Sequence, residues 1–73
     1  MHNDLFAPIS SDFYYRAFTG WPYKTLINEL RWTIECVREA HAEGKHEHAW
    51  EVFQIYLKRR DAIKRLKRDG LLK

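Results

Sequence analysis

Five apolar residues between Pro22 and Gly44 recur at alternating steps of four and three, and this spacing constrains the fold more than any other feature of the chain. They are Tyr23, Ile27, Leu30, Ile34 and Val37, with Leu26 beside them. Steps of four and three place side chains on one face of an α-helix. Pro22 suits the first turn of such a helix, and Gly44 suits a left-handed cap after its end. The spacing therefore predicts a helix over residues 22–43, with one apolar stripe that another element must cover.

A second apolar stripe follows Gly44 and predicts a long helix over residues 46–68. Its members are Ala49, Val52, Phe53, Tyr56, Ile63 and Leu66, with Trp50 and Leu57 on one flank and Ile55 on the other. Glutamates near the start of this helix and Lys and Arg near its end suit the helix dipole. Two long helices joined by a short glycine-containing turn form an antiparallel hairpin.

A shorter helix is predicted over residues 10–19, where aromatic residues recur at helical spacing. Ser10 or Ser11 can cap its start, and Gly20 ends it. An isolated helix of this length is barely stable, so it must pack on the hairpin. The predicted fold is all-α: an antiparallel helical hairpin of two long helices with a short N-terminal helix packed against it. The 73 residues make a single domain over 1–73.

Residues 1–9 are expected to form an extended N-terminal arm, because Pro8 disfavours helix at the preceding residue. Leu5 and Phe6 are apolar in this arm but follow no helical period. Two interpretations stay open. The apolar residues of the arm lie across the helices and cap the core, or the arm is a short peptide segment that binds a partner.

The residue content argues against several classes of protein. The single Cys36 cannot form an internal disulfide, and no run of apolar residues is long enough for a membrane span. The three glycines all fall at predicted helix ends, so no phosphate-binding loop is expected, and no nucleophile elbow is present. We expect a cytoplasmic protein that is not an enzyme, needs no cofactor and has no membrane partner.

Three histidines, His41, His46 and His48, cluster around Gly44 with Cys36 not far away. Their spacing matches neither a zinc protease helix nor paired cysteines of a structural zinc site. We therefore predict no metal site.

Charge is strongly segregated along the chain. Residues 1–57 hold five Lys and Arg against eight Asp and Glu, whereas residues 58–73 hold eight against two. This basic end has three interpretations: a solvated helix end, a nucleic-acid surface, or a patch for an acidic protein partner. Its positive charges lie at many angles around the helix, and no known nucleic-acid-binding motif accompanies them.

Trp32 lies about 200° around its helix from Leu30, on the side away from the apolar stripe. We expect the short N-terminal helix to cover this indole. The alternative is an exposed interface residue, since tryptophan is enriched at the centres of protein interfaces.

A compact, aromatic-rich, charge-segregated chain without a catalytic motif resembles small phage-encoded host-takeover proteins. It is similar in size and character to a Xanthomonas phage transcription regulator that binds bacterial RNA polymerase. The resemblance is one of general character over the whole chain and carries no motif, so it assigns no residue. It implies a protein in the host bacterial cytoplasm that docks on RNA polymerase, inhibits transcription initiation through the σ factor and alters termination.

The sequence thus predicts a non-catalytic, protein-binding transcription regulator. The candidate partner-binding residues are Leu5, Phe6, Trp32, Lys58, Arg59, Lys64, Arg65, Lys67 and Arg68. The first alternative is a small nucleic-acid-binding protein that uses the basic C-terminal helix end. A further alternative is a homodimer whose hairpins pair into a four-helix bundle; we expect a monomer rather than this dimer.

Overall fold

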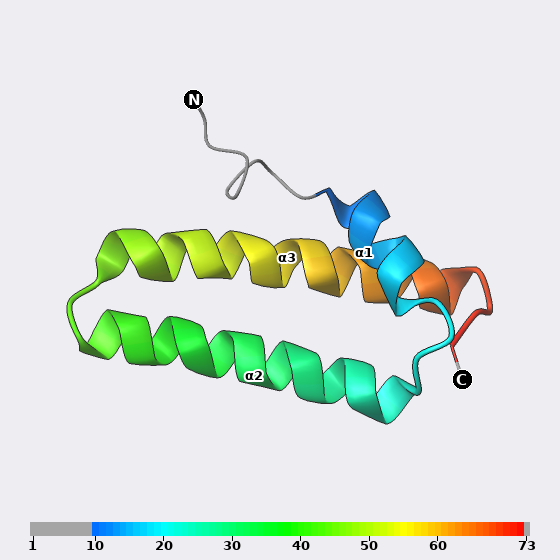
Figure 1. Ribbon diagram of the computed structural model, residues 1–73, viewed down its shortest axis with the longest axis horizontal. Helices are drawn as coiled ribbons and strands as arrows, with labels where there is room; N and C mark the ends of the chain where they lie inside the picture. Colours follow the sequence, from blue (N-terminus) through cyan, green and yellow to red (C-terminus); the bar gives the residue numbers. More distant parts are fainter. Residues whose placement is uncertain (1–9, 73) are drawn as a thin grey trace.

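The computed structural model describes residues 10–72, and these form three helices. They are α1 (Ser11–Phe18), α2 (Tyr23–Ala42) and α3 (His46–Arg68). The two long helices α2 and α3 run antiparallel, and α1 packs on the C-terminal half of α3 (Figure 1). No strand occurs within residues 10–72. The predicted all-α fold, a hairpin with a short helix against it, is confirmed, and each helix ends within one residue of its predicted range. The predicted arm, residues 1–9, lies outside the described part of the chain.

The turn between α2 and α3 follows from the conformation of Gly44. Its φ of 78° lies in the left-handed region, which costs glycine no side-chain clash. The Gly44 amide donates to the carbonyl of His41 at 3.0 Å, and the Lys45 amide donates to that of Ala40 at 2.8 Å. These two bonds satisfy carbonyls at the end of α2 and reverse the chain directly into α3.

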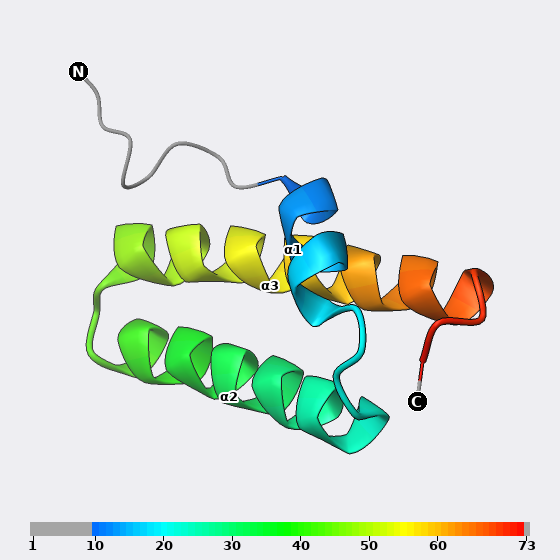
Figure 2. The ribbon, with the colours of Figure 1, turned by 45° about the vertical axis from the view of Figure 1, so that its right-hand side comes forward.

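In Figure 2, α1 lies across α3 on the part of the hairpin away from this turn. The large buried side chains gather there, from all three helices. The buried cluster consists of Tyr14 and Phe18 from α1, Leu26 from α2, and Ala62, Ile63 and Leu66 from α3. Trp21 and Leu72, which flank the helices, pack against it. The hydrophobic core is therefore concentrated at one end of an elongated molecule.

Towards the turn, the contact between α2 and α3 is made by small residues. Thr33, Ala40 and Ala49 are 2%, 5% and 1% exposed. The predicted register of the α2 stripe is wrong in this respect, because the buried row is Leu26, Thr33 and Ala40, at steps of seven. Small side chains let two helices approach closely, so the larger residues of the predicted stripe move to the flank of the contact. Tyr23 is 45% exposed, and Ile27, Leu30, Ile34 and Val37 are only half-buried.

Candidate protein-binding surface

Trp32 is 63% exposed on α2, and the expectation that α1 covers it is wrong. The eight-residue α1 instead lies on α3, where Tyr14 and Phe18 enter the buried cluster. Burial of these two aromatic side chains stabilises α1 at this position on α3. The exposure that the alternative requires is present, and the role of Trp32 at an interface stays a prediction.

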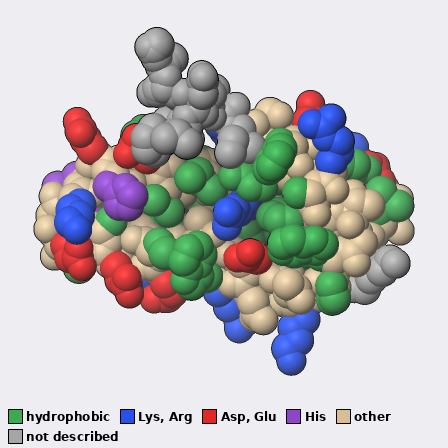
Figure 3. All heavy atoms as spheres, in the orientation of Figure 1, with side chains coloured by type: hydrophobic (Ala, Val, Ile, Leu, Met, Phe, Trp, Pro, Cys, Tyr) green, Lys and Arg blue, Asp and Glu red, His purple; other side chains and the backbone are tan. Residues whose placement is uncertain are grey.

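The view in Figure 3 shows hydrophobic side chains along the middle of one face of the molecule. Histidine and acidic side chains surround the turn end in this view, and most of the basic side chains lie towards the other end. The charge segregation of the sequence thus becomes a separation of charge along the long axis of the hairpin.

The six basic candidate residues divide into two groups. Lys64, Lys67 and Arg68 are exposed, and Lys58 is half-buried. Arg59 and Arg65 are also half-buried, and their guanidinium groups point into contacts with other helices. The structure therefore does not bring the six together as one free basic surface.

Arg59 links all three helices. Its Nη1 donates to Thr33 Oγ1 on α2 at 3.0 Å, and its guanidinium lies 5.3 Å from the centre of the Tyr14 ring on α1. The Thr33 hydroxyl in turn donates to the carbonyl of Glu29 at 2.7 Å. Within residues 10–72 the buried Nε of Arg59 has no hydrogen-bond partner. Through these contacts Arg59 stabilises the packing of the three helices.

Arg65 belongs to a polar network that holds α1 on α3. Its Nη1 donates to Asp12 at 2.6 Å, and its guanidinium lies 4.9 Å from the centre of the Tyr15 ring. The Tyr15 hydroxyl donates to Asp69 at 2.6 Å. This hydrogen bond lowers the pKa of the Asp69 carboxyl, with Arg68 as a further cause, and raises the pKa of the Tyr15 phenol. The hydrogen bond to Asp12 raises the pKa of Arg65.

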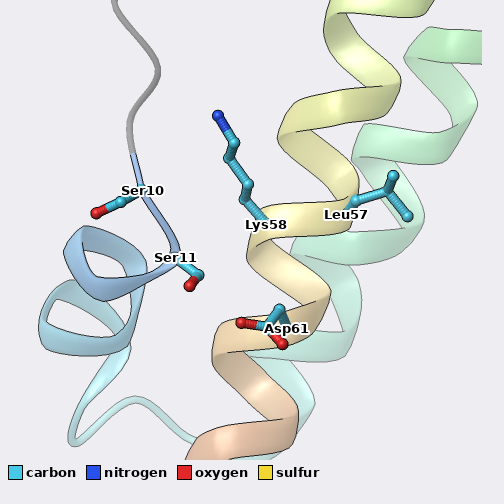
Figure 4. Close-up of a pocket in the computed structure, with 5 residues that line it drawn as sticks. All are labelled: Ser10, Ser11, Leu57, Lys58 and Asp61. Carbon is cyan, nitrogen blue, oxygen red and sulfur yellow. The ribbon is translucent and has the colours of Figure 1, made fainter.

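An open hollow lies where α1 begins beside α3 (Figure 4). Its lining residues are Ser10, Ser11, Leu57, Lys58 and Asp61. In the close-up Lys58 extends towards the start of α1, whereas Leu57 points to the opposite side of α3. The hydroxyl, ammonium and carboxylate groups of the lining do not point towards one common position. Ser10 and Lys58 line this hollow together, and the candidates Leu5 and Phe6 lie outside the described residues.

An apolar groove of about 440 Å³ runs between α2 and α3 near the turn, and sequence reasoning did not identify it as a site. Its lining residues are Ile34, Val37, His41, His46, Ala49, Trp50 and Phe53. Trp50, 60% exposed, forms one wall. Two features of the sequence indicate this groove. Trp50 lies on the flank of the α3 stripe, and the small residues Thr33 and Ala40 lie seven positions apart on α2.

Two of the three histidines around the turn, His41 and His46, lie side by side. His41 Nδ1 and His46 Nδ1 lie 3.0 Å apart, while His48 Nδ1 lies 4.0 Å from Glu51. In the part of the chain that the structure describes, no group of three or more His, Cys, Asp and Glu residues is placed to hold a metal ion. Cys36 is free and half-buried.

Comparison with known proteins found no matching family, no matching curated protein and no matching solved structure. Among residues 10–72, no helix combines the length and the apolar character needed to cross a bilayer.

Proposed function

We propose that this protein is a non-catalytic regulator that binds a larger protein through the face of α2 that carries Trp32. The observation that carries the proposal is the 63% exposure of this indole in the middle of a long helix. A tryptophan that contributes little to its own core keeps a large apolar surface in water, and burial in a complex removes that surface. The arm with Leu5 and Phe6 and the exposed Lys64, Lys67 and Arg68 add apolar anchors and steering charges.

Bacterial RNA polymerase is the partner we propose. The support is the resemblance in size, aromatic content and charge segregation to small phage-encoded host-takeover proteins. On this proposal the protein acts in the bacterial cytoplasm, inhibits transcription initiation and alters termination by occupying a surface of the polymerase. No chemical step of its own is needed.

The roles of the polar groups support a binding function over a catalytic one. Arg59, Arg65, Asp69 and Tyr15 are engaged in contacts between helices. The groove near the turn is lined by apolar side chains and a histidine pair, without a nucleophile beside a base.

Nucleic-acid binding by the basic end is the second candidate. The exposed Lys64, Lys67 and Arg68 favour it, because several such charges on one end can neutralise phosphates. The engagement of Arg59 and Arg65 within the fold disfavours it, since it removes the two guanidinium groups best suited to bidentate phosphate contacts.

A binding assay with purified bacterial RNA polymerase, run with and without nuclease, tests the proposal. Trp32→Ala should weaken binding by at least about tenfold, as loss of an interface-centre tryptophan does. Tyr23→Ala removes another exposed aromatic from α2 and serves as the matched control, which should bind like the original protein. Normal binding by Trp32→Ala, together with loss of binding after nuclease or after neutralisation of Lys64, Lys67 and Arg68, would support the nucleic-acid alternative instead.

A further inference from the structure

Trp32 and Ile55 lie opposite one another on the side of the hairpin away from the apolar groove. Trp32 is two residues before Ile34, which lines the groove, and two residues correspond to about 200° around a helix. By the same geometry, Ile55 lies away from the groove residue Phe53. Trp32 precedes Gly44 by 12 residues and Ile55 follows it by 11, so the antiparallel helices bring them to the same level. Trp32 is 63% exposed and Ile55 is 37% exposed.

The short helix α1 covers only the part of this side that is away from the turn. The guanidinium of Arg59, one helical turn after Ile55, lies over the Tyr14 ring of α1. Ala62, two turns after Ile55, belongs to the same buried cluster as Tyr14. Because α3 begins at His46, about 20 Å of this helix precede Arg59. We call this length of the Trp32 side the open half; it is long enough for roughly three to four turns of another helix.

Glutamates surround the indole in the open half. On a helical wheel Glu39 lies about 20° from Trp32, and Glu29 and Glu35 lie about 60° to either side of it. Glu35 pairs with Arg38 at 3.3 Å, whereas Glu29 and Glu39 form no ion pair within residues 10–72. Two carboxylates beside the exposed indole are therefore available to positive charges from outside.

The basic residues of the hairpin lie away from the indole. Those of α2 lie about 80° or more from Trp32 on the wheel. They are Lys24, Arg31 and Arg38. On α3, Lys58 lies about 60° from Ile55, but its side chain extends towards the start of α1 (Figure 4). Glu51, nearer the turn, lies 4.0 Å from His48. The open half thus has an apolar centre and an acidic border.

We propose that the open half binds a short amphipathic helix of the partner protein, with Lys and Arg beside its apolar stripe. This inference rests on the proposed function and specifies the chemistry of the segment that Trp32 contacts. One helix, α1, already packs on this side of the hairpin, so a second helix laid end to end with α1 meets a similar surface. Its apolar residues bury Trp32 and Ile55, and its positive charges lie beside Glu29 and Glu39.

The charges disfavour the two occupants that the chain itself supplies. In a dimer formed through the open half, a two-fold axis would bring the glutamates of one copy close to those of the other. Residues 1–9 contain no Lys or Arg, and they include Asp4. A basic segment of another protein is therefore the complementary occupant.

Two synthetic peptides of about 15 residues, held helical by side-chain cross-links, test this proposal. Both have the same apolar stripe, flanked by Lys and Arg in one peptide and by Glu and Asp in the other. Each is titrated into the full chain by nuclear magnetic resonance, with the indole resonance of Trp32 identified from Trp32→Phe. We expect the basic peptide to bind at least about tenfold tighter than the acidic one at low salt. It should shift the Trp32 indole and leave that of Trp50, in the groove, in place.

A pair of charge variants tests the role of the glutamates. Glu39→Lys should remove the preference for the basic peptide. Asp61→Lys changes the net charge equally, at a position about 120° around α3 from Ile55, and is the matched control that should keep the preference. Equal affinity of the original chain for both peptides, or equal effects of the two variants, would overturn the proposal.

The same resonance distinguishes the other occupants. A Trp32 indole that shifts with protein concentration would assign the open half to a second copy, and one that shifts when residues 1–9 are deleted would assign it to the arm. Either result would overturn the partner helix. Because no polymerase is present, a lost peptide preference with intact Trp32-dependent polymerase binding would reject this inference alone, and the reverse would reject only the proposed partner.

Discussion

At the scale of single residues, the contact between Arg59 and Thr33 stabilises the middle of the hairpin. Thr33→Val removes the hydroxyl that accepts from Arg59 Nη1. The half-buried guanidinium of Arg59 then lacks this hydrogen bond. We expect this change to lower the free energy of unfolding by about 1–3 kcal/mol. Arg59→Met keeps an unbranched apolar stem and removes the charge, so we expect a loss of at most about 1 kcal/mol.

The double variant Thr33→Val/Arg59→Met separates the energy of the hydrogen bond between these side chains from the effect of each substitution alone. Because the unpaired donor is then gone, it should be more stable than Thr33→Val alone, as measured by urea unfolding. Strictly additive losses would show that the hydrogen bond between these two side chains contributes nothing to stability.

At the scale of the helix, α1 is held on α3 by contacts between ionisable side chains, so their strength depends on pH. The pKa of Asp69 is depressed below 3.8, so its contribution to stability is present above that value and is lost as the pH falls through the folded pKa. The pKa of Tyr15 is raised above 10.0, so its contribution is present below that value and is lost as the pH rises through the folded pKa.

Tyr15→Phe removes the shared hydrogen bond and should therefore flatten both limbs of the dependence of Tm on pH. The acid limb should be reduced rather than abolished, because Arg68 also contacts Asp69 at 3.1 Å. Tyr23→Phe, on the exposed start of α2, is the control. A Tyr15→Phe profile that superimposes on that of the original protein would mean that this network does not hold α1.

The register of α2 can be tested directly by truncating its side chains. Leu26 is fully buried, whereas Leu30 is half-buried beside the same cluster. We expect Leu26→Ala to cost about 2–5 kcal/mol in unfolding free energy and Leu30→Ala distinctly less. Equal losses in chemical denaturation would favour the register that the heptad spacing predicts over the one described here.

At the scale of the whole molecule, the large buried side chains are concentrated at one end. The turn end has only the small residues Ala40 and Ala49 buried at its centre, with Thr33 buried in the middle of the hairpin, so less apolar area is buried near the turn. In dilute solution, amide hydrogens in the last turns of α2 and the first turns of α3 should exchange faster than those around Leu26 and Leu66.

Mass-spectrometric hydrogen exchange measures this difference between the two ends of the hairpin. Protection that is uniform along the hairpin would contradict the uneven core.

The number, order and length of the helices are determined by the sequence itself. The apolar spacing of α2 and α3, the cap at Ser10 and the left-handed Gly44 are local features, and local rules describe them well. The separation of acidic and basic residues along the hairpin also follows, because an antiparallel pair puts residues near the turn at one end.

Only the tertiary structure decided which side of each stripe is buried. The helical wheel favours the large residues Ile27, Leu30, Ile34 and Val37, yet the helices approach along Leu26, Thr33 and Ala40. Close packing over the whole contact outweighs the burial of any one side chain, and a wheel drawn for one helix contains no information about the shape of its neighbour. For the same reason, the exposure of Trp32, the inward contacts of Arg59 and Arg65, and the groove beside Trp50 depend on where three helices meet, which no single stretch of the sequence contains.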